Sequence, residues 1–261
     1  MLSNRRRLLK EYFQTKPFIK LTELEALFPR VSSMTLRRDI EYFEKAGDVI
    51  KVRGGARSMK FIKTSLEDPF ETRENENPYI KEIICKKAAE YMEQGRSIFL
   101  DSGTTMLKFA EHIKDERLTI TTTAPNVAIK LLRHSNIIVN IVGGMVNRDN
   151  ISVAGTQAME FLGLINIDTA FIVPSGFSVE HGFTSGNYSE CEIKQLIVKK
   201  AAKKILLLDN GKIGKNLPYT FAGLKDIDVL ISNDYLPYEI LRSVEEYGVK
   251  IVHVNSEKLM I

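Results

Sequence analysis

Polar and glycine-rich runs follow short β-rich segments at four places in the chain. They are Asp101–Thr105 (DSGTT), Thr121–Thr123, Gly143-Gly144 and Asp209–Gly214 (DNGKIG). In the first run, Gly103 permits a tight turn, and hydroxyls together with backbone N–H groups at a helix start favour an anion such as phosphate. The chain lacks both the GK[ST] ending of a P-loop and the GxGxxG of a dinucleotide site. Together the four runs predict a site for a phosphorylated polar ligand, although each run alone is also compatible with an ordinary turn.

Three charged side chains could add proton-transfer chemistry to such a site. Glu190, Asp209 and Lys212 could serve as acid, base and electrostatic clamp beside a sugar carbonyl, provided that a carboxylate lies within reach of the carbon acid. In the alternative, Asp209 caps a turn and Lys212 holds a phosphate or carboxylate without chemistry. The two cysteines and four widely separated histidines, with no HxxxH pair, predict neither a metal site nor a cofactor.

Positive charge is concentrated at the start of the chain. The first 60 residues hold 14 Lys or Arg against 7 Asp or Glu, whereas the remainder holds 23 against 26. A basic segment attached to a slightly acidic one indicates a polyanionic partner for the basic part. The alternative is a solvated charged surface. The secondary-structure elements that carry these basic residues distinguish between the two interpretations.

Helical spacing of apolar residues predicts helices over residues 5–13 and 21–28 and a third helix from residue 33 onwards. We expect Thr22, or a residue just before it, to cap the second helix and Ser32 to cap the third. The stretch Asp48–Ala56 alternates like a strand and contains a Gly-Gly turn, which is typical of a β-wing. A short helix, a turn and a helix with Arg and Thr near its start form a helix-turn-helix, whose second helix enters the DNA major groove.

Nine residues are expected to contact DNA: Arg5, Arg6, Ser32, Ser33, Thr35, Arg37, Arg38, Lys51 and Arg53. The arginines near the start of the chain and the two basic residues of the wing suit phosphate contacts. Those of the third helix suit base edges, because an arginine fork pairs with guanine. We expect Asp39 to hold Arg37 or a neighbouring backbone group rather than DNA.

Seven β-rich runs, most of them separated by helical segments, predict an α/β fold with a mostly parallel sheet. The runs are Ser97–Asp101, Leu118–Thr122, Ile137–Val142, Thr169–Val173, Lys204–Asp209, Val229–Ser232 and Lys250–Val254. Such sheets bind ligands beyond the carboxyl ends of their strands. The polar stretch 58–78 is predicted to be a linker, partly ordered around Phe61, Leu66 and Phe70. The predicted organisation is therefore a DNA-binding domain over 1–57, a linker over 58–78 and an α/β domain over 79–261.

Composition excludes several other classes of protein. The 261 residues are 44% hydrophobic and 27% charged, which is typical of a globular protein. No run of about 18 apolar residues is present, so no membrane span is expected. The first residues lack the apolar core and cleavage site of a secretory signal. We therefore expect a soluble cytoplasmic protein without a disulfide framework.

The first part of the chain resembles the winged helix-turn-helix domain of the DeoR family of bacterial transcriptional regulators. The resemblance rests on Arg5 with Leu9, the run Ser32–Ile40, Gly47 and the run Val52–Ala56. Family members usually place histidine where this chain has Arg53, so a basic residue is retained there.

The rest of the chain resembles the sugar-phosphate-sensing domain of the same family. The matching residues are Asp101–Thr105, Gly143-Gly144, Gly155, Phe171-Ile172, Gly176, Gly182, Thr184, Glu190, Asp209, Lys212 and Gly214. The resemblance implies a Rossmann-like α/β domain similar to ribose-5-phosphate isomerase that binds a phosphorylated sugar. The effector-binding residues would be Asp101, Ser102, Gly103, Thr104, Thr105, Thr122, Thr123, Gly143, Gly144, Glu190, Asp209 and Lys212. The chain departs from the family at Thr123, Val173-Pro174 and Gly211, where Asn, Gly and Ser are usual.

These features predict a regulator, by default a repressor, of a carbohydrate-metabolism operon. Its partners would be double-stranded operator DNA, a phosphorylated sugar and further copies of the chain in a dimer or tetramer. One alternative is a regulator whose pocket is vestigial and whose second domain serves only for oligomerisation. Another is a sugar-phosphate isomerase, which would have no use for a basic winged helix.

Overall fold

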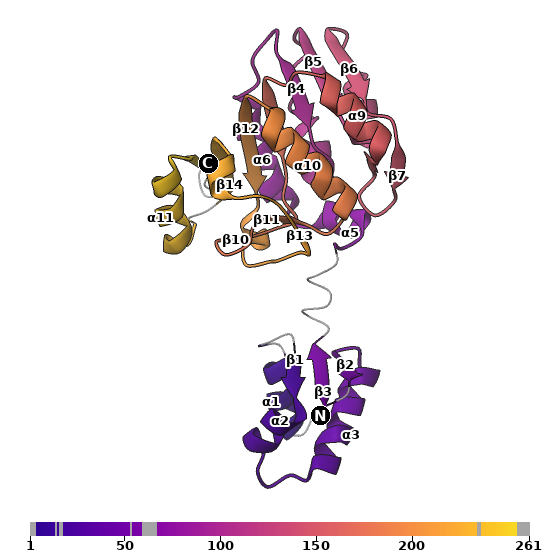
Figure 1. Cartoon of the computed structure of the whole chain (residues 1–261), viewed down its shortest axis with the longest axis vertical. Coiled ribbons are helices and arrows are strands. Elements are labelled where there is room, and N and C mark those ends of the chain that lie inside the picture. The colour runs from indigo at the N-terminus through magenta and orange to yellow at the C-terminus, as the bar shows by residue number, and fades with distance from the viewer. Residues whose placement is uncertain are drawn as a thin grey trace. The chain divides into compact units, whose positions relative to one another are not determined.

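The chain folds into two units. The structure is a computed structural model that describes residues 4–13, 15, 18–52, 54–58, 67–233 and 236–254. It divides into an N-terminal unit, residues 1–66, and a C-terminal unit, residues 67–261 (Figure 1). Arg53, Phe61 and Leu66, which figure in the sequence-based predictions, lie outside the described residues.

The N-terminal unit contains three helices and a small antiparallel sheet. The helices are α1 (Asn4–Phe13), α2 (Leu21–Leu27) and α3 (Ser33–Lys45), and the strands are β1 (Phe18–Lys20), β2 (Val49–Val52) and β3 (Gly55–Ser58). The three helices and the β2–β3 hairpin are as predicted. Strand β1 was not predicted, because its three residues gain their order only by pairing with β3. Gly55 permits this approach, since a Cβ there would lie 2.1 Å from the Ile19 carbonyl oxygen.

A seven-stranded parallel sheet forms the centre of the C-terminal unit. Its order is β15-β14-β12-β9-β4-β5-β6, and every neighbouring pair is parallel. The strands are β4 (Ser97–Leu100), β5 (Leu118–Thr122), β6 (Ile137–Ile141), β9 (Thr169–Ile172), β12 (Lys203–Leu208), β14 (Val229–Asn233) and β15 (Lys250–Val254). These are the seven predicted runs, so the predicted parallel α/β fold is confirmed.

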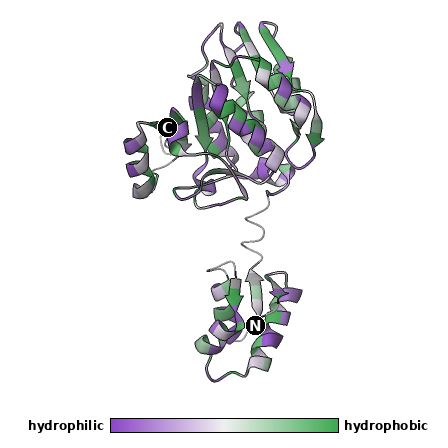
Figure 2. Cartoon of the chain, in the orientation of Figure 1, coloured by the Kyte–Doolittle hydropathy of each residue, from purple (hydrophilic) through white to green (hydrophobic). Residues whose placement is uncertain are grey.

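Helices cover both faces of this sheet. On one face lie α6 (Pro78–Ala89), α7 (Thr104–Phe109) and α8 (Pro125–Leu131), and on the other lie α9 (Thr156–Leu164), α10 (Tyr188–Lys200) and α11 (Tyr238–Tyr247). Alternate side chains of β4 supply the two cores: Ile98 and Leu100 face the first group of helices, and Phe99 faces the second. Figure 2 shows hydrophobic strands inside and hydrophilic residues on the outer side of α10.

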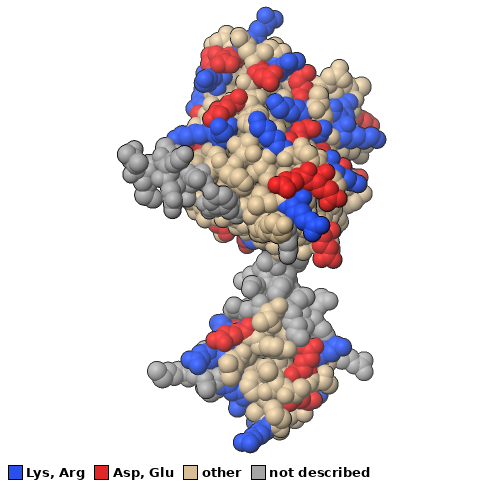
Figure 3. Space-filling view, turned by 90° about the vertical axis from the view of Figure 1, so that its left-hand side faces the viewer, with Lys and Arg blue, Asp and Glu red and all other residues tan. Residues whose placement is uncertain are grey.

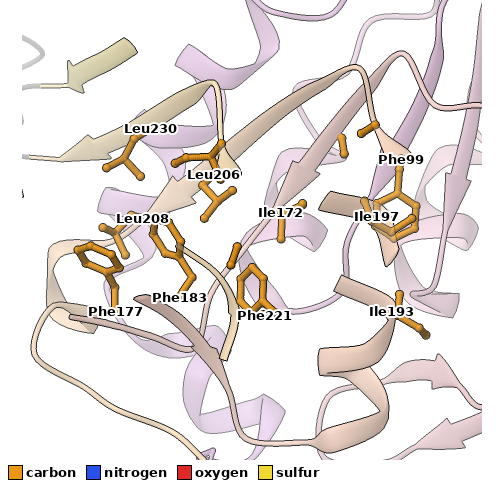
Figure 4. Close-up of a cluster of buried hydrophobic side chains, with 14 of the residues drawn as sticks. Phe99, Ile172, Phe177, Phe183, Ile193, Ile197, Leu206, Leu208, Phe221 and Leu230 are labelled. Atoms are coloured by element: carbon orange, nitrogen blue, oxygen red, sulfur yellow. The ribbon is translucent and has the colours of Figure 1, made fainter. Parts of the chain in front are cut away.

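A three-stranded sheet closes the second core near the carboxyl ends of the main strands. It consists of β10 (Gly176–Ser178), β11 (Gly182–Ser185) and β13 (Tyr219–Ala222). Phe177 and Phe183 stack at 4.5 Å between ring centroids, and with Phe221 they face Leu206 and Leu208 of β12 (Figure 4). This sheet and the hairpin of β7 (Met145–Asn147) and β8 (Ser152–Ala154) were not predicted, because strands of three or four residues leave little periodicity.

The stretch predicted as a linker is only partly a linker. Ser58 ends strand β3, and Glu67 already belongs to the C-terminal unit. Within the predicted linker, α5 (Phe70–Asn75) is held to the C-terminal unit by Phe70, which is 4% exposed. One buried aromatic residue thus anchors this otherwise polar segment, in agreement with the predicted partial order around Phe70.

Candidate functional site

The start of α3 is held by a capping residue and exposes polar side chains. The Ser32 hydroxyl accepts a hydrogen bond from the Thr35 N–H at 3.3 Å, as predicted. Leu36, Ile40 and Phe43 are buried. Because these residues fix one face of α3, Ser33, Arg37 and Arg38 are left exposed. The expected cap at Thr22 is not found, because Lys20 precedes the first residue of α2 and makes no side-chain cap.

Asp39 joins two helices of the N-terminal unit. Its buried carboxylate accepts hydrogen bonds from Arg5 Nε at 2.7 Å and Arg6 Nε at 2.8 Å. The predicted partner of Asp39, Arg37 or a neighbouring backbone group, is therefore wrong, because Asp39 is buried against α1 whereas Arg37 is exposed. The hydrogen bond that Arg5 donates to Asp39 raises the pKa of Arg5, so Arg5 stays charged. Both arginines remain about a third exposed, 33% and 32%, and still present positive charge at the surface.

Replacing Asp39 by alanine is expected to destabilise the N-terminal unit by about 1–3 kcal/mol, because two arginines lose their common acceptor. Hydrogen exchange of peptides from residues 4–58 would show the loss. Asp48→Ala is the control, since the Asp48–Lys10 pair is accessible to solvent, with side chains 27% and 44% exposed, and is worth about 0–1 kcal/mol. Equal effects of the two substitutions would contradict the role of Asp39.

The wing offers a basic residue that is already paired. Lys51 Nζ lies 2.5 Å from Glu41, and this hydrogen bond lowers the pKa of the Glu41 carboxyl. The pair is exposed, so Lys51 could exchange Glu41 for a DNA phosphate at little cost in free energy. Figure 3 shows that Lys and Arg alternate with Asp and Glu on the visible face of each unit.

The main sheet of the C-terminal unit reverses its order between β4 and β9. In open α/β sheets ligands bind at this switch point, outside the carboxyl ends of the strands. Asp101 follows β4 and forms a buried ion pair with Lys194 of α10, and it also accepts the Val173 N–H at 3.0 Å. Lys194 Nζ donates in turn to the Val173 carbonyl oxygen at 2.8 Å. The pair therefore fixes the two strand ends and α10 to one another.

The predicted phosphate turn lies beside this ion pair. Gly103 has φ +99°, a conformation that favours glycine, and Thr104 and Thr105 begin α7 as buried residues. At the end of β5, the buried Thr122 hydroxyl accepts the Ala124 N–H at 3.1 Å, and the Thr123 carbonyl oxygen accepts the Val153 N–H at 2.7 Å. Ser102, which lies between Asp101 and Gly103 in the sequence, is buried as well. The structure thus brings hydroxyl-rich ends of two adjacent strands together.

The paired glycines serve a packing requirement. A Cβ at Gly144 would lie 2.6 Å from the Ala154 carbonyl oxygen of β8, whereas nothing lies within 4 Å of a Cβ at Gly143. Gly144 thus allows the β7–β8 hairpin to turn back closely. Both glycines are exposed.

Glu190 lies buried at the start of α10 and accepts hydrogen bonds from Asn150 and Ser152. Asn150 Nδ2 donates to its two carboxylate oxygens at 2.8 and 2.7 Å, and the Ser152 hydroxyl donates to one of them. Burial raises the pKa of Glu190, and the nearby Glu67 carboxylate adds to this shift. The β7–β8 hairpin therefore positions Glu190 through Asn150 and Ser152.

Asp209 and Lys212 flank the short turn Asn210–Lys212. Asp209 caps this turn by accepting the Gly211 N–H at 2.8 Å, and it accepts Asn77 Nδ2 at 3.1 Å. Lys212 Nζ donates to the Pro174 carbonyl oxygen at 2.7 Å. Burial lowers the pKa of Lys212 to about 7, and Asp209 opposes that shift. Because an anion beside a lysine favours its charged form, an anionic ligand at this position would raise the pKa of Lys212 again.

Sequence reasoning missed several groups at this edge of the sheet. Glu67, Arg73 and Asn77 come from the stretch predicted as a linker, and Lys194 from a helix predicted only as a covering element. Arg73 donates to the Asn150 side chain and, at 3.1 Å, to the Asp149 carbonyl oxygen. Polar composition assigned these residues to solvent, and no local signal indicated partners about 75 residues or more away along the chain.

A cavity of about 230 Å³ opens beside Thr104. It is lined by Glu74, Pro78, Lys81, Thr104, Leu107, Lys108, Glu111 and Lys130. Lys108 and Lys130 are both paired with Glu111, so the charges of this cavity are largely balanced. Among the described residues no group of three or more His, Cys, Asp or Glu could hold a metal ion.

A winged helix-turn-helix unit joined to an α/β unit with polar groups at its switch point defines the class of DNA-binding transcriptional regulators. The DeoR-like helix-turn-helix domain matches residues 5–61, and the DeoR C terminal sensor domain matches residues 76–234. The chain belongs to the DeoR family, and it is a transcriptional regulator rather than an enzyme. In the described part of the chain, every helix is too short or too polar to cross a membrane.

Relatives extend over most of the chain. The HTH-type transcriptional regulator GlpR of Haloferax volcanii is 32% identical over 85% of this chain and 86% of its own length. The putative aga operon transcriptional repressor of Escherichia coli O157:H7 is 26% identical over 97% of this chain and 94% of its own. Ribose 5 phosphate isomerase A from Neisseria gonorrhoeae shares 13% identity at a TM-score of 0.39, covering 52% of this chain and 53% of that one.

Proposed function

We propose that the chain represses a carbohydrate-metabolism operon and that a phosphorylated sugar, bound in the C-terminal unit, modulates its affinity for DNA. The observation that carries this proposal is the convergence of Asp101, Lys194, Glu190 and Lys212 at the switch point of a sheet attached to a winged helix. The name of the Escherichia coli relative, an operon repressor, supports the sign of regulation.

The DNA half of the proposal rests on the start of α3. Ser33, Arg37 and Arg38 are exposed there, and Thr35 is half-buried beside them. We assign Arg37 and Arg38 to base edges and phosphates, since an arginine fork suits both. Arg5, Arg6 and Lys51 would supply phosphate contacts from the flanks, which makes affinity fall with salt.

The effector half rests on charge and on hydrogen-bond donors. The hydroxyls and N–H groups of Ser102–Thr105 and the Lys212 ammonium would hold the phosphate, and Glu190 and Asp209 would accept sugar hydroxyls. Thr122 and Thr123, at the carboxyl end of the neighbouring strand β5, would complete the lining of the effector site. Binding would shift the C-terminal unit between two states that bind DNA differently, so effector and operator affinities are coupled reciprocally.

A second copy of the chain is the expected partner of the C-terminal unit. Large apolar side chains are exposed on β6, the last strand of the sheet, on α8 and the residue that follows it, and on α9: Ile129, Leu132, Ile138, Ile141 and Leu164. An apolar sheet edge of this kind is normally covered in a stable protein. A homo-oligomer in the cytoplasm would place two recognition helices on repeated half-sites.

Thermal unfolding of the full chain against sugar phosphates and their unphosphorylated parents tests the effector. A ligand at a hundredfold excess over its dissociation constant should stabilise the chain by about 2.7 kcal/mol. Stabilisation by an ester but not by its parent sugar is the expected result. If no ester stabilises the chain, the pocket is vestigial and the C-terminal unit serves oligomerisation.

Replacing Thr104 and Thr105 together by alanine should remove this stabilisation and leave DNA binding intact, because the phosphate loses two hydroxyl donors. Thr156→Ala, at the exposed first residue of α9, is the matched control. Both are compared by thermal shift and by release of bound DNA. If the double variant still releases DNA at the same ester concentration, the phosphate turn is assigned to the wrong residues.

A further inference from the structure

Glu67 places a carboxylate inside the C-terminal unit at the edge of the sheet. Its side chain is only 8% exposed although it is the first residue of the unit. The Ser175 hydroxyl donates to Oε1, and the Gly186 N–H points at the same oxygen from 3.5 Å. Arg73 Nη2 lies 4.0 Å from Oε2. A hydroxyl, a backbone N–H and a guanidinium therefore surround one buried anionic group.

The backbone around Glu67 is shaped to admit it. A Cβ at Gly186 would lie 2.9 Å from Glu67 Cγ, so a larger residue there would collide with the side chain. Ser175 follows β9, one of the two strands at the switch point, and Gly186 lies between β11 and α10. The position of the Glu67 carboxylate thus belongs to the same strand-end region as the proposed effector site.

Two ionisable groups of the proposed effector site, Glu190 and Lys212, respond to the charge of Glu67. The Glu67 carboxylate adds to the burial that raises the pKa of Glu190, and it helps Asp209 to keep Lys212 protonated against burial. Glu67 therefore lies within electrostatic range of both. Donors of these three kinds also bind phosphate oxygens, which carry more charge than a carboxylate.

We propose that Ser175, the Gly186 N–H and Arg73 form an oxyanion-binding position of the effector site, which Glu67 fills in the absence of effector and a phosphate group takes over from it. This inference rests on the proposed function, and it assigns two effector-binding side chains, Ser175 and Arg73, and one internal competitor. Because Glu67 begins the C-terminal unit, its release changes where the chain leading from the DNA-binding unit is anchored.

A titration of the full chain with inorganic phosphate tests the competition. If Glu67 fills the position nine times in ten, Glu67→Gln should lower the half-saturating phosphate concentration by about tenfold, measured by thermal shift. Glu71→Gln, an exposed carboxylate on the same segment, is the matched control and should leave that concentration unchanged. Ser175→Ala and Arg73→Gln should raise it, because they remove donors to the phosphate.

Hydrogen exchange of residues 67–78 gives a second readout that needs no sugar. Exchange should rise in the wild-type chain when phosphate is added, and it should already be high in Glu67→Gln without phosphate. Phosphate binding of equal or lower strength in Glu67→Gln, or unchanged exchange in this segment, would overturn the inference while the effector site stands. If neither phosphate nor any ester binds to either chain, the proposed effector site fails and this inference fails with it.

Discussion

Arg38→Ala is expected to abolish specific operator binding while the melting temperature of the chain stays nearly unchanged. Arg38 is exposed on α3, so its removal creates no cavity and orphans no buried partner. Each lost arginine–base contact costs about 1–3 kcal/mol, and a homodimer on a two-fold site loses two of them. DNase footprinting on DNA selected from random sequence by the wild-type chain, together with circular dichroism melting, measures both quantities.

The matched control lies on the same helix. Lys45 is also exposed but is the last residue of α3, away from the end that enters the groove, so Lys45→Ala should change specific binding little. An unaltered footprint with Arg38→Ala would remove this residue from the DNA-contacting surface. Equal losses in the two variants would indicate that general positive charge, rather than one contact, determines binding.

Lys194→Met should destabilise the C-terminal unit by about 3–5 kcal/mol, the usual cost of removing one partner from a buried ion pair. Lys194 and Asp101 are only 4% and 3% exposed, so water cannot solvate the Asp101 carboxylate once its partner is removed. Denaturant unfolding followed by far-ultraviolet circular dichroism measures the loss. An effect below about 1 kcal/mol would show that the pair behaves as a surface pair.

A double-mutant cycle separates the ion pair from the packing of the lysine stem. Asp101→Asn keeps an oxygen that can accept the Val173 N–H but removes the charge. Lys194→Met should therefore cost several kcal/mol less in an Asp101→Asn background than in the wild-type chain. Equal costs in the two backgrounds would assign the destabilisation to lost packing, including the contact of Lys194 with the Phe221 ring.

The main sheet could be predicted from the sequence because each of its strands lies in a run rich in apolar or β-branched residues. Burial on both faces gives such runs in Lys203–Leu208 or Thr169–Ile172, and helices between them imply parallel pairing. Strands β1 and β7 could not be predicted, because three residues acquire strand geometry only from the strand beside them. Order around Phe70 was predicted, but the α5 helix itself was not, because six residues give little periodicity.

The candidate site was predictable where local chemistry marks it. Gly103 in a turn and Ser32 at a cap are short-range signals, and both predictions are confirmed by the backbone geometry. Lys194 and Arg73 carried no such signal, because their partners lie 93 and 77 residues away in the chain. Long-range ion pairs and hydrogen bonds depend on the tertiary fold, which residue spacing does not encode.

The strand order of the main sheet has a consequence for the chain during its synthesis on the ribosome. β4 pairs with β5 soon after both emerge, but its other edge waits for β9, whose residues 169–172 follow only after several seconds at about 5–20 residues per second. The N-terminal unit, in contrast, has all its described helices and strands by Ser58. A nascent chain stalled between β6 and β9 would thus carry a folded DNA-binding unit attached to an incomplete sheet in which one edge of β4 is unpaired. Chaperones bind partly folded chains of this kind.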